Sequence, residues 1–152
     1  DKELDYNKDN IETVLINSNF SCNYIINRNK LFDLFKFKYN IHALYDPCSY
    51  PGIQCKFYYN KNKNIQDGLC NCNKKCTSKN KVCSIISFMI FRTGSVLIVG
   101  HCDENILNVI YKFLKNILIT DFENIYVNTD FNTNAEKKKK TKKKRKRQII
   151  VW

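Results

Sequence analysis

The sequence predicts an α+β fold, with one antiparallel sheet of about five strands and two helices on one face. Three segments read as strands, at 52–59, 84–91 and 95–99, while two others repeat apolar residues at helical spacing. The order along the chain is strand, helix, three or four strands, helix. With 152 residues, 43% of them apolar and 13% aromatic, the chain suits one domain with a sizeable core.

The first half of the chain supplies a strand, a helix and a short strand. Residues 11–20, IETVLINSNF, have strand composition, and residues 28–39 predict a helix capped by Asn27. Three apolar residues of this helix share one face: Leu31, Leu34 and Phe35. Residues 41–45, IHALY, form a short strand that the Asp46-Pro47 turn signal closes.

The second half supplies the remaining strands and the long helix. Residues 52–59 alternate in the period of a strand, and residues 84–101, SIISFMIFRTGSVLIVGH, predict a hairpin that turns at Thr93-Gly94. Asp103 then caps a helix whose apolar residues recur at helical spacing. These residues are Ile106, Leu107, Ile110, Phe113, Leu114 and Ile117.

Both faces of the predicted hairpin are apolar. One face carries Ile86, Phe88, Ile90, Val96 and Ile98, and the other carries Ile85, Ser87, Met89, Phe91, Leu97 and Val99. Two short helices can cover only one face of such a sheet. An uncovered apolar face of several hundred Å² marks a binding site. The cover could be a partner protein, a second copy of the domain or the minor groove of DNA, whose floor is comparatively apolar.

The net charge of +12 is concentrated near the end of the sequence. Residues 137–147, KKKKTKKKRKR, hold ten of the 26 basic residues, which leaves 16 against 14 acidic residues and a body near neutrality. Such a run repels itself, so we expect 127–152 to be a disordered basic tail that binds nucleic acid or directs nuclear import. The alternative is a solubilising tail without a partner. Residues 1–10 predict a polar lead-in, and we expect the chain to be a fragment.

No stretch approaches the roughly 18 apolar residues of a membrane span, and the start lacks a signal pattern. We therefore expect a soluble intracellular protein that does not engage a membrane. Eight cysteines are compatible with a secreted disulfide scaffold, but the large apolar core and the import-like tail favour a reducing compartment.

Two motifs carry a resemblance to a known family. YDPCSYPG at 45–52, followed by FMIFRTGSVLIVGH at 88–101, resembles the second repeat of the TATA-box-binding protein family. The motifs agree with that family in spacing and order, and the similarity covers about residues 11–118, one repeat of the usual two. The resemblance implies a domain at 11–126 that forms half of a curved saddle. It also implies a transcription initiation factor that binds and bends AT-rich duplex DNA through the minor groove.

The resemblance assigns roles by position. Tyr50 and Phe91 match a pair of intercalating phenylalanines, and Lys56 matches an arginine that contacts phosphate. Four residues match apolar groove contacts: Leu15, Met89, Leu97 and Val99. Thr13 stands at the position of a base-contacting asparagine, and Arg92 completes the predicted DNA-binding set. The ordinary interpretation of Phe91 and Met89 is a core role.

Some positions depart from the family. Thr13 replaces the asparagine, Val99 replaces a threonine and Cys102 replaces a lysine, so polar and phosphate contacts are reduced. Strict TATA specificity therefore does not follow. The implied partners are double-stranded DNA, initiation factors or RNA polymerase, and a second repeat upstream or a second copy that pairs edge to edge. The implied location is the nucleus or a viral replication compartment.

Residues 60–83 replace a turn that is short in the family. Four cysteines occur there at C-x-C-x3-C-x6-C: Cys70, Cys72, Cys76 and Cys83. Four thiolates can hold one tetrahedral zinc, and free or redox-active thiols and disulfides are the alternatives, because the usual C-x-x-C pairs are missing. As the resemblance has it, comparable cysteine-bearing insertions occur in TATA-binding-like proteins of large DNA viruses. The remaining cysteines are interpreted as small buried residues: Cys22, Cys48, Cys55 and Cys102.

Two other function classes compete with DNA binding. The histidines are His42 and His101, and His101 adjoins Cys102, which could suggest a thiol nucleophile. Adjacent side chains on a strand point to opposite faces, however, and no orienting group is evident, so we do not expect an enzyme. The stronger rival is a protein-interaction module that uses the same apolar face without bending DNA.

Overall fold

The computed structural model describes residues 12–70, 72, 76 and 82–128. The predicted lead-in at 1–10 and the basic run at 137–147 lie outside these residues. The elements follow one another as β1 (Ile16–Ser21), α1 (Arg28–Asp33), η2 (Leu34–Lys38), β2 (His42–Leu44), β3 (Ile53–Tyr59), β4 (Ser84–Ile90), β5 (Ser95–Gly100), α2 (Glu104–Thr120) and α3 (Phe122–Ile125).

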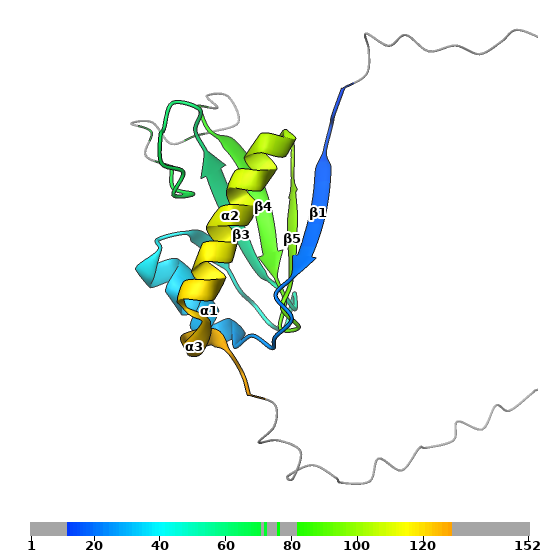
Figure 1. The fold of residues 1–152 in the computed structure, drawn as a ribbon, viewed down its shortest axis with the longest axis vertical. Coiled ribbons are helices and arrows are strands. Elements are labelled where there is room, and N and C mark those ends of the chain that lie inside the picture. The colour runs from blue at the N-terminus through cyan, green and yellow to red at the C-terminus, as the bar shows by residue number, and fades with distance from the viewer. Residues whose placement is uncertain (1–11, 71, 73–75, 77–81, 129–152) are drawn as a thin grey trace, which may run out of the picture.

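The strands form one antiparallel sheet in the order β1-β5-β4-β3-β2. In Figure 1, α2 lies across one face of the sheet and β1 forms its edge. Two main helical segments accompany five strands, so the α+β prediction is confirmed.

The core lies between the sheet and the helices. Alternate residues of the three central strands are buried on this side: Ile53, Cys55, Phe57, Ile86, Phe88, Ile90, Val96 and Ile98. Phe35 from η2 meets Phe88 edge to face with ring centroids 5.7 Å apart, and Phe113 from α2 meets Phe57 at 5.1 Å. Both helices therefore cover the same face, as the hairpin pattern predicts.

Capping and turn residues set most boundaries where the sequence predicts them. The side chains of Asn27 and Asp103 accept hydrogen bonds from the backbone N–H groups of Lys30 and Ile106 and so cap α1 and α2. Gly94 turns the β4–β5 hairpin at φ +83°, and a Cβ there would stand 2.4 Å from the carbonyl oxygen of Tyr24. Only glycine satisfies both conditions.

The prediction of a strand over 11–20 is wrong for residues 12–15, since β1 begins at Ile16. Ile16 pairs with Gly100, the last residue of β5, and the chain then turns into α2. No described strand pairs with residues 12–15, while residue 11 lies outside the described part. Strand composition without a neighbouring strand does not make a strand.

The predicted helix over 28–39 is present but changes its winding at Leu34. The segment Leu34–Lys38 is a π-helix in which the N–H of Tyr39 donates to the carbonyl of Leu34. The short α3 helix was not predicted, because four residues carry no periodic signal.

A buried carboxylate joins η2 to the end of α2. Asp121, 2% exposed, accepts hydrogen bonds from Lys38 Nζ at 2.7 Å and from Tyr39 Oη at 2.6 Å. Burial alone raises the pKa of Asp121, but these two donors outweigh it and hold the pKa below the ordinary 3.8.

We expect Asp121→Asn to destabilise the fold by about 1–3 kcal/mol at neutral pH, because the charged partner of Lys38 and Tyr39 is lost. A group with a lowered folded pKa stabilises above its unfolded pKa and loses that contribution as pH falls through the folded value. The difference between the two proteins in urea unfolding should therefore shrink below the ordinary pKa of 3.8. Glu123→Gln, an exposed neighbour, is the control and should change little.

Candidate functional site

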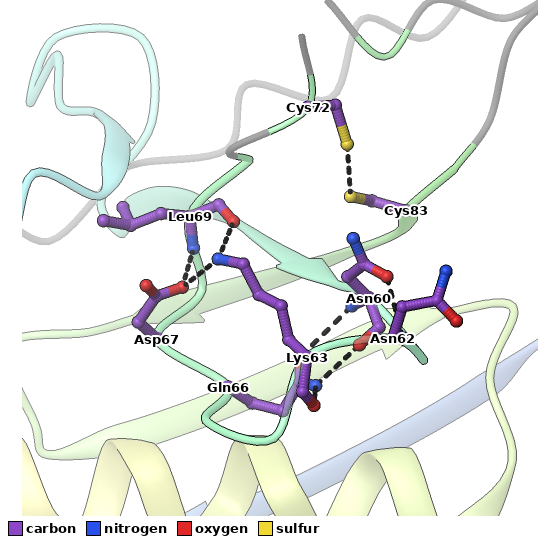
Figure 2. A network of polar contacts seen from close by, with 8 residues as sticks. All are labelled: Asn60, Asn62, Lys63, Gln66, Asp67, Leu69, Cys72 and Cys83. Atoms are coloured by element: carbon purple, nitrogen blue, oxygen red, sulfur yellow. Dashed lines mark hydrogen bonds and ion pairs between the residues drawn. The ribbon is translucent and has the colours of Figure 1, made fainter.

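The first half of the β3–β4 insertion at 60–83 is held by its own polar side chains (Figure 2). Gln66 Nε2 donates to the carbonyls of Asn60 and Lys63, at 2.7 and 2.8 Å, and Gln66 Oε1 accepts from the N–H of Asn60 at 3.1 Å. One amide thus satisfies three backbone groups that a loop would otherwise leave to water. Residues 60–66 are folded without apolar burial.

A second contact set fixes the residues just before the first cysteine. Lys63 Nζ lies 3.0 Å from Asp67 Oδ1 and donates to the carbonyl of Leu69 at 3.2 Å, while the N–H of Leu69 donates to Asp67 Oδ1 at 2.9 Å (Figure 2). Partial burial raises the pKa of Asp67, but the Leu69 N–H and Lys63 outweigh it and lower that pKa overall. Cys70 therefore follows a fixed segment.

The insertion is anchored to the sheet at Gly68. Its carbonyl accepts the N–H of Tyr58 at 3.1 Å, just beyond the residues of β3 that pair with β2. Gly68 has φ +77°, and a Cβ there would stand 2.9 Å from the ring of Phe57. Leu69 packs against the core.

The four predicted ligands are together: the sulfur atoms of Cys70, Cys72, Cys76 and Cys83 all lie within 4.8 Å of one another. Cys70 and Cys76 are 3.4 Å apart at sulfur, Cys72 and Cys83 3.5 Å, and Cys72 and Cys76 3.6 Å. Figure 2 shows Cys72 pointing at Cys83. A tetrahedral ion with metal–sulfur bonds of about 2.3 Å has sulfur–sulfur edges of about 3.8 Å. The cluster could hold a metal ion such as zinc.

The electrostatic setting differs across the cluster. The backbone N–H of Cys72 and the thiol of Cys76 lower the pKa of Cys70 to about 7, whereas burial raises the pKa of Cys83. A metal ion binds thiolates and displaces their protons, so it would reverse the effect at Cys83.

The second candidate site is the open face of the sheet, opposite the helices. Strand pairing places its residues in two rows. One row is Asn19, Leu97, Met89, Gln54 and Leu44, and the next is Asn17, Val99, Ser87, Lys56 and His42. Met89, Leu97 and Val99 are partly exposed and belong neither to the core nor to the side chains packed against it. The ordinary core interpretation therefore does not hold for Met89.

The two predicted wedge residues meet at one end of this face. The rings of Tyr50 and Phe91 have centroids 6.0 Å apart, and the Tyr50 hydroxyl lies 3.4 Å from Met89 Sδ. Both rings are partly exposed, and Phe91 also lies outside the core. The turn that carries Tyr50 is held by Asp46, which accepts the N–H of Cys48 and the hydroxyl of Ser49.

The other predicted contacts are less closely grouped. Lys56 lies on the open face, while Arg92 is exposed in the β4–β5 turn. Thr13 and Leu15 are exposed but precede β1, so strand pairing does not fix them. Cys48 is exposed in its turn, so its interpretation as a buried residue is wrong.

Three amide side chains on the open face were missed by sequence reasoning. Asn17 and Asn19 are exposed on β1, and Gln54 is partly exposed on β3. The alternation of residues 16–21 contains the signal, because every second residue faces away from the helices. Polar groups are thus present on a face whose polar contacts were expected to be reduced.

An apolar groove runs between the edge strand β1 and α2. Its volume is about 420 Å³, and aromatic and aliphatic side chains form most of its wall. The main contributors are Phe20, Tyr24, Tyr111, Leu118, Ile119 and Phe122. Ile119 is 64% exposed, and none of the residues that the structure describes covers this groove or pairs with the outer edge of β1.

The histidine and cysteine that could suggest catalysis are separated. His101 is exposed, with Nδ1 3.1 Å from the carbonyl of Val14, whereas Cys102 is buried, and burial raises the pKa of its thiol. A thiol with a raised pKa is a poor nucleophile at neutral pH.

Comparisons of the chain with protein-family models, with curated proteins and with solved structures found no match. Among the described residues, no helix has the length and apolarity needed to cross a membrane.

We expect Gln66→Ala to loosen residues 60–66, because three backbone groups lose their partner, at a cost of about 1–3 kcal/mol in the partly buried loop. Hydrogen exchange at the Asn60 amide should accelerate while amides of β3 stay protected. Asn62→Ala is a milder comparison, since Asn62 contributes its backbone N–H to the loop rather than its side chain. Equal exchange in the two variants would contradict the role given to Gln66.

Proposed function

We propose that this chain is a DNA-binding module of transcription initiation, resembling one repeat of the TATA-box-binding protein family, and that its open sheet face lies in the minor groove. The observation that carries the proposal is the apolar strip of Met89, Leu97 and Val99. It lies outside the core and opposite the helices. A folded chain keeps such a strip partly exposed at the expense of hydrophobic stabilisation, which a bound ligand restores.

The chemistry around the strip favours DNA over an apolar protein surface. Amides flank it on both sides, at Asn17 and Asn19 on β1 and at Gln54 on β3, and Lys56 adds a positive charge. The residues that face away from the helices in the five described strands include no carboxylate. Minor-groove edges of A·T pairs present only acceptors, which amide N–H groups can meet.

The end of the strip offers the wedge that bending requires. Tyr50 and Phe91 lie together and are only partly covered, so either ring can enter a base step while leaving the core intact. Unstacking a step costs a few kcal/mol, which the bent duplex repays through a larger contact. The basic run at 137–147 would add sequence-independent attraction to phosphates.

The proposal includes a companion half at β1. That strand has β5 as its one neighbour among the described strands, and the apolar groove continues from it towards α2. The companion is a second repeat of a longer chain or a second copy. Initiation factors or RNA polymerase are the protein partners in this proposal, the nucleus or a viral replication compartment is the location, and zinc is the ion of the cysteine cluster.

The second candidate function is a non-enzymatic interaction module of a transcription complex. The exposed groove favours it, because Ile119 and Phe122 need a protein or peptide partner rather than DNA. In that version the open face also packs on a polypeptide, and no duplex bends.

DNA binding predicts that a version without residues 137–152 shortens the end-to-end distance of an AT-rich duplex in a fluorescence-transfer assay, with affinity that falls steeply with salt. Phe91→Ala should abolish the shortening and leave the unfolding transition nearly unchanged, because no core cavity forms. Phe37→Ala, on the helix side and outside the apolar groove, is the matched control and should bend DNA normally. Loss of DNA binding when the tail is removed would favour the interaction module. Unfolding of Phe91→Ala would show that Phe91 is a core residue.

If two copies pair edge to edge at β1, the chain on its own should self-associate. Sedimentation at increasing concentration should show a dimer, and Ile119→Glu should weaken it, because a charge enters the apolar groove. Leu44→Glu, equally exposed but on the opposite strand β2, should leave it intact. A monomer at every concentration would exclude a second copy as the companion.

A further inference from the structure

The second half of the insertion contains thiols but almost no other apolar side chain. Between Cys70 and Cys83, Val82 is the one apolar residue that is not a cysteine, and it is 58% exposed. Hydrophobic burial therefore does not account for the gathering of four cysteines. Something else must hold their sulfurs within 4.8 Å.

We infer that one Zn²⁺ binds through the thiolates of all four cysteines. We further infer that this ion ties Cys70, Cys72 and Cys76 to Cys83, beside the start of β4, and is not needed for the sheet to fold. This role is independent of DNA binding. Four sulfur ligands leave no open position, so the ion is structural rather than catalytic.

The sulfur spacing selects a single ion. The three closest contacts, from 3.4 to 3.6 Å, are near the edge of about 3.8 Å expected around one tetrahedral zinc. A multi-iron cluster would place its inorganic core between the cysteines and hold their sulfurs farther apart. Disulfides need about 2.05 Å, and all four residues are free thiols. Soft thiolates also disfavour Mg²⁺ and Ca²⁺.

The contacts divide the insertion into two parts. Residues 60–69 are held by the side chains of Gln66, Lys63 and Asp67 and by the hydrogen bond between the Gly68 carbonyl and β3. None of these contacts involves a thiol. Cys83 is only 2% exposed, yet it is not part of the core cluster between sheet and helices. Because Cys83 lies outside that cluster, removing the ion leaves the core contacts in place.

The test uses the full chain, reduced and freed of metal by a chelator, then titrated with Zn²⁺ and separately with Co²⁺. We expect one equivalent of either ion, the visible absorption of tetrahedral cobalt–thiolate, and four sulfur neighbours at about 2.3 Å in zinc X-ray absorption. Alkylation should spare the four cluster cysteines when zinc is bound and label Cys48. The metal-free protein should keep its strand and helix circular dichroism and unfold cooperatively at a lower temperature.

Cys76→Ser should weaken zinc binding by more than about 100-fold, the upper range for loss of an outer-shell partner, because a direct ligand is removed. Cys48→Ser, an exposed cysteine outside the cluster, should bind zinc as the parent does. Fewer than four sulfur neighbours, a preference for iron, or two disulfides under reducing conditions would overturn the zinc assignment. Unfolding of the sheet on metal removal would contradict the inference that the ion acts only on the cysteine part of the insertion. None of these measurements includes DNA, so failure of DNA binding would leave the inference standing.

Discussion

The packing of two helices against a single face of the sheet is the constraint on which the other features depend. Phe35 and Phe113 reach the sheet through Phe88 and Phe57, and all of these rings lie on the same side. Since no described helix covers the opposite side, every second residue of β4 and β5 remains available to a ligand. Whether an apolar residue of β4 or β5 belongs to the core or to the open face therefore depends on which of the two alternating sets of strand positions it occupies.

That parity explains what sequence reasoning could and could not determine. The two faces of the hairpin were separable because a strand alternates strictly, and the helix-facing set agrees with the buried residues. Where strands begin was less predictable, because β1 depends on the length of β5 rather than on its own residues. Asn17 and Asn19 share the parity of Leu15 and were missed because the resemblance gives them no role. The α3 helix was missed because four residues make barely one helical turn and carry no repeat.

The insertion shows a similar division between local and long-range information. The close spacing of the four cysteines predicted a common metal site, because the ligand chemistry of a thiolate depends on the side chain alone. The role of Gln66 was not predictable, since it depends on the loop bringing the carbonyls of Asn60 and Lys63 to one amide. Polar clamps of this kind follow from three-dimensional geometry and leave no periodic pattern.

The two edges of the sheet, β1 and β2, differ in the length of backbone that is open to a further strand. The edge strand β2 has only three residues, and beyond it the insertion contacts β3, because the Gly68 carbonyl accepts the N–H of Tyr58. The insertion thereby covers the part of β3 that β2 leaves unpaired, and β2 itself offers only three residues as the edge on that side. At the other end β1 presents six residues and an adjoining apolar groove, with no comparable cover among the described residues. The longer edge is therefore β1, and an extension of the sheet across β1, as in the proposed pairing, would place the amides of Asn17 and Asn19 near the middle of the enlarged surface rather than at its rim.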